Sequence, residues 1–552
     1  MYSGSEIISF QIGHYANFIG THWWNCQEGG FIFDQDSQSE INNDVLFREG
    51  QTQRREVTYT PRLLLVDLKG SLGALPECGS LYEPPPRPDR NLPLWPPDCV
   101  EITSESSEPK NEFQLDLEQA ETSAATLPNG LKESGLAVPK LYNLDDSVKS
   151  WPDFLRPHLH PRTVNVVHEY RHGDTTSPFE TVPQGLAQWA VPGFNEEFSD
   201  RIRLYMEETD NLQGYQMLLD SYNGFAGLSC GVLQHLRDEY PSKPVFCVAC
   251  QPPSNQTTTK QDSVRILNQA LALSSLSELS SLFTPVSGST GAWRDLGHPV
   301  TMPHLNYKAD LMYHSSALVA AALDTVSLLY RTRRSERLGD LTTRVAAYGR
   351  KATALSVSLP FALHTDGSLL ETLEAWEGPL CHPLTPLSDV TESQQSLVLR
   401  GVSEDKLMKD KHRTMESSNP AYSCRTRAQL LKTFMSFIRH SSSEINVATY
   451  DSALKTTAPF PHIFSKNLTS KGYLDTRPRP PQYGVNEVSV LAGLHTSPEL
   501  GSLLESLVSE AKKINIRTLH QFASSGLETT ELGESLESLL CLSECYSDRM
   551  DF

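Results

Sequence analysis

Three closely spaced glycines, Gly224, Gly227 and Gly231, could form a loop that holds a phosphate group. They follow an apolar run over residues 212–219 that reads as a buried strand. The apolar residues after them recur at helical spacing and end before a proline: Val232, Leu233, Leu236, Tyr240 and then Pro241. A glycine loop between a strand and a helix N-terminus can bring backbone N–H groups close to a phosphate, and the helix dipole favours the anion there. We therefore expect residues 222–231 to be a loop and a candidate anion site.

Two segments near the N-terminus would place further polar residues beside this loop. Residues 6–12 alternate in the manner of a strand, and residues 13–24 read as a helix. Residues 62–68 form a nearly continuous apolar run, as expected of a strand buried on both faces. This order of elements predicts an α/β domain with a largely parallel sheet.

The composition limits the classes of partner. The chain has 552 residues and a net charge of −20, which disfavours nucleic acid and anionic lipid as general partners. The N-terminus lacks the basic region and the long apolar region that are typical of a signal peptide. The longest apolar span, residues 316–329, contains Asp324 and is shorter than the roughly 20 residues that cross a bilayer. We expect no transmembrane segment, and any membrane contact should be peripheral.

Three changes in composition suggest the division of the chain. Residues 73–149 are rich in proline and then in acidic and serine residues, which predicts a mostly disordered insertion. Residues 403–425 read as a long flexible loop, and leucines at helical spacing predict C-terminal helices. We predict an N-terminal domain from residues 1–72 and 150–330, a second domain over 331–496, and C-terminal helices over 497–552.

Several segments resemble the tubulin superfamily, in the right order and nearly from end to end. The first ones carry tubulin-like patterns such as EI…Q-x-G-x-x-x-N-x-I-G and L-Q-G-F-Q. In this sequence they read EIISFQIGHYANFIGTHWW, YTPRLLLVDLKGSL, EETDNLQGYQ, LRDEYP, YKADLMYH, VLRGV and LHQF. The resemblance implies a tubulin-like fold: a parallel-sheet nucleotide-binding-type domain, an α+β second domain and C-terminal helices.

One divergent branch is more similar still. The segment WPDFLRPHLHPR, the tandem Trp23 and Trp24, and the insertion after LKGSL resemble the misato family, tubulin-like proteins of mitochondrial distribution and morphology. This resemblance implies a cytoplasmic protein that is peripheral on the outer mitochondrial membrane and is needed for mitochondrial fusion. It also implies protein partners there, with tubulin and chaperonin as candidates.

The resemblance to tubulins implies where a nucleotide would bind, and the residues there depart from the tubulin pattern. The positions are Gly13, His14, Asp67, Lys69, Gly224 and Gly227. His14 and Tyr15 replace glutamine and cysteine, and Tyr15 should intrude on the phosphate floor. Phe225 is bulky where a small residue is expected, so the loop should not wrap a pyrophosphate closely.

The metal and base positions also depart from the pattern. Lys69 replaces a glutamate that helps to hold hydrated Mg²⁺, although a lysine could pair directly with a phosphate. The guanine-reading asparagine has no clear counterpart, since residues 328–331 stand roughly there. The hydrolysis-promoting loop is shortened to residues 338–341, with Asp340 as its acidic remnant. We expect a degenerate site, no cofactor and a non-enzymatic protein; the alternative is an active GTP-binding and GTP-hydrolysing cytoskeletal protein.

Other motifs are weaker. His168, Glu169 and His172 spell H-E-x-x-H, which on a helix would bind Zn²⁺, but the preceding residues read as a strand. Cys247 and Cys250 lie in an apolar run and should be buried thiols on a strand. The strongest basic cluster should be a solvated helix end or linker, or else a contact for an acidic partner or lipid headgroups. It contains Arg331, Arg333, Arg334 and Arg337.

Overall fold

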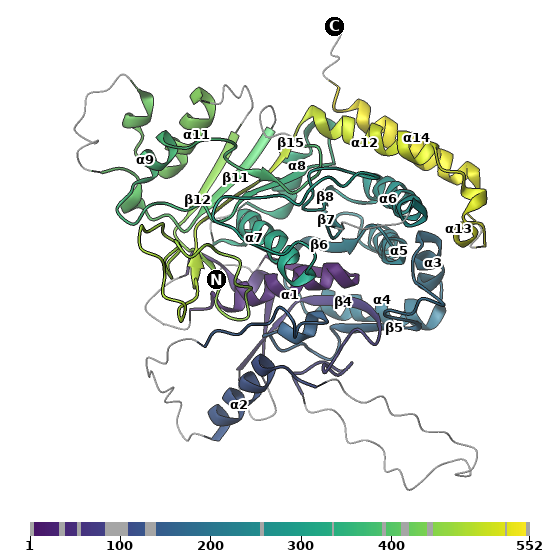
Figure 1. Cartoon of the computed structure of the whole chain (residues 1–552). Helices are drawn as coiled ribbons and strands as arrows, with labels where there is room; N and C mark the ends of the chain where they lie inside the picture. Colours follow the sequence, from purple (N-terminus) through teal and green to yellow (C-terminus); the bar gives the residue numbers. More distant parts are fainter. Residues whose placement is uncertain are drawn as a thin grey trace.

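Six parallel strands form the sheet of the N-terminal half in a computed structural model of the chain (Figure 1). The structure describes residues 5–32, 39–51, 57–82, 109–126, 140–253, 259–333, 336–388, 394–409, 419–438, 445–524 and 527–547. Their order in the sheet is β5-β4-β1-β6-β7-β8, and every pair of neighbours is parallel, as the sequence predicted. The strands are β1 (Glu6–Ile12), β4 (Leu63–Lys69), β5 (Val164–Arg171), β6 (Leu212–Asp220), β7 (Val245–Cys250) and β8 (Leu282–Val286).

Helices cover both faces of this sheet, which explains why its central strands are buried throughout and mostly apolar. Every residue of β1, β6 and β7 is buried. One face packs against α1 (His14–Glu28) and α7 (Met312–Arg331). The other face packs against α3 (Val182–Trp189), α4 (Pro192–Glu207), α5 (Gly224–Glu239) and α6 (Thr259–Leu279).

The central helix α7 lies between this sheet and a second sheet of mixed direction (Figure 1). Side chains of α7 and of both sheets share one apolar core. The outer face of the second sheet packs against α9 (Leu369–Glu374) and α11 (Arg427–Ile438), while α8 (Leu338–Val345) follows α7. The second sheet has the order β10 (His382–Pro383), β9 (Ala354–Ser358), β15 (Val490–Thr496), β11 (Gln394–Arg400) and β12 (Ile445–Tyr450).

Two short hairpin sheets and the C-terminal helices complete the described elements. The hairpins are β2 (Phe47–Gln51) with β3 (Val57–Pro61), and β13 (Leu454–Lys455) with β14 (Glu487–Val488). The predicted C-terminal helices are present as α12 (Pro498–Lys512), α13 (His520–Ser524) and α14 (Thr529–Glu544). Their leucines enter the core that α6 shares, because helical spacing places them on one face. The architecture agrees with the predicted fold class.

The insertion over residues 73–149 contains regular structure that its composition did not predict. Helix α2 (Glu112–Thr126) lies within it, and the Phe113 side chain is buried. Further along, Leu144 is buried and Asp145 accepts a hydrogen bond from His314 of α7 at 2.8 Å. These apolar and charged contacts stabilise segments that a count of proline and serine assigns to disorder. Most of that prediction falls on residues 83–108 and 127–139, and part of the predicted loop at 403–425 falls on 410–418, outside the described residues.

Helix α7 is longer than the apolar run suggested. Its 20 residues reach the length and apolar composition that could cross a membrane, and it is the one such helix among the described residues. Nearly all of it is buried inside the protein, between the two sheets. A core helix that packs on two layers needs the same apolar composition.

Candidate functional site

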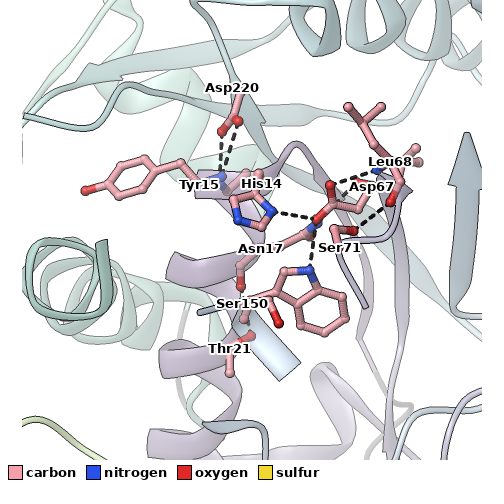
Figure 2. A network of polar contacts seen from close by, with 12 residues as sticks. His14, Tyr15, Asn17, Thr21, Asp67, Leu68, Ser71, Ser150 and Asp220 are labelled. Carbon is pink, nitrogen blue, oxygen red and sulfur yellow. Dashed lines mark hydrogen bonds and ion pairs between the residues drawn. The ribbon is translucent and has the colours of Figure 1, made fainter. Parts of the chain in front are cut away.

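The carboxyl ends of β1, β4 and β6 meet at one edge of the parallel sheet, where open α/β sheets commonly bind their ligands (Figure 2). The structure brings His14, Asp67 and Asp220 together at this edge. His14 and Asp67 were predicted site residues, whereas Asp220 was not. All three are buried, with Asp67 and Asp220 at 0% exposure.

Asp67 accepts hydrogen bonds from four donors of the protein itself. Its Oδ2 accepts hydrogen bonds from His14 Nδ1 at 3.1 Å and from Trp151 Nε1 at 2.9 Å. The same oxygen accepts from Asn17 Nδ2 at 3.1 Å, and Oδ1 accepts from the backbone N–H of Leu68 at 2.8 Å. Oδ2 is therefore saturated, whereas Oδ1 keeps one lone pair. Because Asp67 is 0% exposed, a metal ion could reach it only if the surrounding side chains moved.

His14 and Asp67 form a buried ion pair. Burial would lower the pKa of His14, but the attraction of Asp67 and their hydrogen bond outweigh it and hold this pKa above its usual value. Burial would likewise raise the pKa of Asp67, and the same partner holds it below its usual value. The two directions agree with a protonated imidazole beside an ionised carboxylate. The imidazolium of His14 thus balances the charge of the buried carboxylate.

A second histidine covers the pair. The ring of His172 lies 4.0 Å from the ring of His14, between centroids. Burial, and then repulsion by His14, lower the pKa of His172, so it should be neutral at pH 7. His172 thus closes the cluster from the end of β5.

Asp220 caps helix α1 from a distant part of the chain. Its two oxygens accept the backbone N–H groups of Tyr15, at 3.2 Å, and of Ala16, at 2.8 Å. These groups are among the N–H donors that lack partners at the start of a helix. Gly13, at the N-cap position, has no side chain to serve them, so the carboxylate of Asp220 takes that role.

The close approach of Asp220 to the start of α1 requires glycine at position 13. Its φ of +128° lies in a region that favours glycine, and a Cβ atom on it would lie 2.4 Å from Cγ of Asp220. The predicted site residue Gly13 therefore makes room for a protein carboxylate in this structure.

The predicted glycine loop is helical, which corrects our reading of residues 222–231. Helix α5 begins at Gly224, and the Asn223 side chain caps it by accepting the N–H of Phe225 at 3.0 Å. Gly224, Gly227 and Gly231 lie inside the helix and are buried. The pattern was misread because glycines at helical spacing also suit the close packing of two helices.

The contacts of these glycines explain why there is no room for a side chain at their positions. A Cβ atom on Gly227 would lie 1.9 Å from the carbonyl oxygen of Val182 in α3. A Cβ atom on Gly185 of α3 would lie 1.9 Å from the carbonyl oxygen of Gly224. The two helix backbones thus nearly touch. Gly224 and Gly227 serve helix packing here, and the Phe225 ring packs 5.2 Å from that of Phe179.

The side chains of Lys69 and Tyr15 do not enter the cluster. Lys69 is exposed at the end of β4, and its carbonyl accepts the N–H of His172 at 2.9 Å. The Tyr15 hydroxyl donates to Ser315 of α7 at 3.2 Å, and the ring points away from His14 (Figure 2). The prediction that Tyr15 intrudes on a phosphate floor is therefore not met by its side chain.

Two further positions were singled out in the sequence for base reading and hydrolysis. Residues 328–331 end helix α7, about 20–24 Å along its axis from Ser315, which contacts Tyr15. They are buried in the core. Asp340 caps α8 by accepting the N–H of Arg337 at 3.2 Å.

The residues of the weaker motifs make ordinary structural contacts. His168 lies on strand β5 and is 62% exposed, with Glu77 at 3.8 Å, while His172 packs on His14. The part of the chain that the structure describes holds no group of three or more potential metal ligands. Cys247 and Cys250 are buried on β7, as predicted.

The predicted basic cluster is divided between the core and the surface. Arg331 is buried and pairs with Asp324 at 2.7 Å, so it is not a solvated helix end. The exposed Arg333 donates to the carbonyl of Ser39 at 3.1 Å, and Arg334 lies outside the described residues. Asp324 and Arg331 lie seven positions apart on one helix, and no pattern in the sequence indicated that they form an ion pair.

A cavity of about 600 Å³ opens beside the cluster without exposing it. Tyr222 and Asn223, which follow Asp220, line one side of it. Its other walls come from α6, from the start of α7 and from the segment before α14, including Lys260, Arg265 and His520. Its volume falls in the range of small-molecule sites.

Comparison with known proteins identifies the family. Residues 5–119 match the Misato Segment II tubulin-like domain, and residues 139–332 match the Tubulin domain. Protein misato homolog 1 of Danio rerio is 34% identical over 98% of this chain and 96% of its own length. Protein misato of Drosophila melanogaster is 34% identical, and Protein misato homolog 1 of Homo sapiens is 33% identical, each with 98% of both chains covered.

The chain belongs to the misato family. The six-stranded parallel sheet, the second sheet and the C-terminal helices are thus the tubulin-like fold of a misato-family protein. Within that fold, Asp67 and Gly13 occupy the predicted edge of the sheet. The residues that close the site, Asp220, Trp151 and His172, were missed. Only the adjacency of β6 to β1 brings Asp220 to α1, and sequence spacing does not show which strands are neighbours.

Proposed function

We propose that this misato-family protein is a non-enzymatic, tubulin-like regulator of mitochondrial distribution, morphology and fusion. It would act in the cytoplasm and as a peripheral protein on the outer mitochondrial membrane. The mitochondrial part of the proposal rests on the family. The non-enzymatic part rests on one observation, the closed state of Asp67, which is fully buried and accepts hydrogen bonds from four protein donors.

Hydrolysis of a nucleoside triphosphate needs groups that offset charge on the transferred phosphoryl group, commonly a bound Mg²⁺ ion. Asp67 is the carboxylate nearest to that task at this edge, and its partner is the protonated His14. A second cation beside this pair would be repelled at short distance. The arrangement supports a scaffold that uses the surfaces of the fold and not phosphoryl transfer.

Nucleotide binding without hydrolysis is the second candidate. The cavity beside Asn223 favours it, because a volume of about 600 Å³ can hold a nucleoside. Lys260 and Arg265 on its walls could meet an anion, although Arg265 already pairs with Asp262 at 2.8 Å. This candidate predicts binding that does not depend on Mg²⁺.

The partners would be proteins at the outer mitochondrial membrane, with tubulin and chaperonin as the candidates to test first. No nucleic acid is expected, since the net charge is −20. Immunoprecipitation of the tagged chain from cytosol and from mitochondrial membranes, followed by mass spectrometry, tests this. The proposal fails in this part if mitochondrial outer-membrane proteins are not enriched over a tag-only control.

Cell complementation tests the function directly. Cells depleted of this protein should recover a normal mitochondrial network with the wild-type chain and equally with Lys69→Ala. Lys69 is an exposed cation at the end of β4 and could pair directly with a phosphate at this edge. A Lys69→Ala chain that is expressed normally but fails to restore the network contradicts the non-enzymatic proposal. Release of the protein from mitochondria by alkaline carbonate is expected for peripheral attachment, and retention contradicts it.

A further inference from the structure

Two backbone N–H groups at the N-terminus of α1 point toward the edge of the sheet, where the carboxylate of Asp220 on β6 binds them. Asp220 lies 204 residues from Ala16 in the sequence. It is 0% exposed, and each of its oxygens accepts a different N–H. Backbone N–H groups and the dipole at a helix N-terminus favour an anion from any source.

Three features of the site position this carboxylate. Asn223 Nδ2 donates to Oδ2 of Asp220 at 3.4 Å, from the start of α5. Burial raises the pKa of Asp220 to about 7, and the attraction of His14 acts against this and favours the ionised form. Gly13 leaves the space, since its Cβ atom would lie within 2.7 Å of three Asp220 atoms. Asparagine at position 220 would fill the same volume but offer only one acceptor oxygen to two donors.

We propose that Asp220 is an internal ligand: its carboxylate occupies an anion-binding position at the N-terminus of α1 that an external small oxyanion would otherwise fill. The sheet edge is then assembled in the absence of any bound anion, and the wild-type chain is closed to external anions there. This inference deepens the proposed function, because it supplies the group that replaces a ligand in a non-enzymatic scaffold.

Removing the carboxylate should open the position. Asp220→Ala leaves the N–H groups of Tyr15 and Ala16 without partners and leaves a gap the size of the lost carboxyl group. Formate has that size and charge. At pH 8, formate should raise the melting temperature of Asp220→Ala in a saturable manner, relative to chloride at equal ionic strength. The wild-type chain should show no difference between the two salts.

Two further variants test whether formate acts at the gap left by the Asp220 carboxyl group. In Asp220→Ala combined with Gly13→Ala, the new methyl group enters the gap, so the response to formate should be lost. Asp220→Asn keeps the gap filled and should melt lower than wild type without responding to formate. If Asp220 were only a structural cap and the position had no preference for an anion, each of the four proteins would melt at the same temperature in formate as in chloride.

A response of Asp220→Ala that equals the wild-type response overturns the inference. If Asp220→Ala is recovered unfolded, refolding yield is the readout, and equal yields in formate and chloride overturn it. The proposed function fails by a different result, saturable Mg²⁺-dependent GTP binding by the wild-type chain. The two failures are therefore distinguishable in one set of proteins.

Discussion

Two buried polar clusters lie near opposite ends of helix α7, and they differ in what they connect. At the N-terminal end, the cluster of His14, Asp67 and Asp220 joins helix α1 to strands β4 and β6 at a single sheet edge. At the C-terminal end, Asp324 of α7 pairs with Arg331 of the same helix and with Arg400 of β11 in the second sheet. Trp23 of α1 also donates to Asp324, at 3.1 Å.

The two clusters also differ in the groups that they contain. The first cluster contains imidazoles and carboxylates whose pKa values are displaced by burial and by each other. The second consists of a carboxylate between two guanidinium groups. The first stands where this type of fold binds ligands, and the second ties the central helix to the second domain. We therefore assign closure of the site to the first cluster and coupling of the domains to the second.

The largest effect should come from breaking the second cluster. Asp324→Ala leaves Arg331 and Arg400 buried without their shared anion, which should lower the free energy of unfolding by about 3–5 kcal/mol. Urea denaturation followed by circular dichroism measures this. As the control, Asp200→Ala removes the partner of Arg203 on the surface of α4, and its stability should stay close to that of wild type. Equal losses in the two variants would contradict the coupling role.

A smaller loss should follow from separating α3 and α5. Gly227→Ala places a methyl group 1.9 Å from the Val182 carbonyl oxygen, so one helix must move, at about 1–3 kcal/mol. Gly533→Ala is the matched control, because a Cβ atom there meets nothing within 4 Å in helix α14. It should stabilise the chain slightly, since alanine favours a helix more than glycine does. If both variants gain stability, the glycines of α5 do not serve packing.

The first cluster should be visible in the pH dependence of stability. Burial raises the pKa of Asp220 to about 7, whereas an unfolded aspartate has a pKa of about 3.9. The folded chain therefore binds more protons between these values, and its free energy of unfolding falls as the pH rises through that window. The raised pKa of His14 acts in the same direction above pH 6.5, and the lowered pKa of Asp67 acts oppositely only in acid.

Asp220→Asn should remove the contribution of Asp220 to this slope, which is at most about 1.4 kcal/mol per pH unit. Other groups that face Asp220 (Tyr15, Tyr222 and Cys250) have pKa values raised by burial and stay neutral in this range. Urea denaturation of both proteins from pH 5 to pH 8 gives the comparison. Parallel curves for wild type and variant would show that Asp220 is not the titrating group.

The smallest effect is expected at the H-E-x-x-H segment. His168 is 62% exposed on a strand, so His168→Ala should change the free energy of unfolding by less than about 0.5 kcal/mol. The zinc content of the dialysed protein should be equally low in wild type and variant. Stoichiometric zinc that is lost in the variant would require a metal site there.

Much of the fold followed from local patterns, and the site did not. The apolar runs of β1, β4 and β6 predicted buried parallel strands, and their ends placed Gly13 and Asp67 correctly at one edge. The role of each residue there depends on partners more than 50 positions away, such as Trp151 for Asp67 and Asp220 for Ala16. The glycines of α5 show a second limit, because close helix packing and a phosphate loop call for the same residue. Arg331 shows a third, since a buried ion pair and an exposed basic cluster look alike in sequence.

We propose that this misato-family chain closes its predicted nucleotide position with its own side chains. The most direct test is isothermal titration of the purified wild-type chain with GTP, in the presence of Mg²⁺ and again in EDTA. We predict no saturable binding that depends on Mg²⁺. Stoichiometric binding that is lost in EDTA would contradict the proposal, because a metal and a nucleotide would then have entered the edge of the sheet that these side chains close.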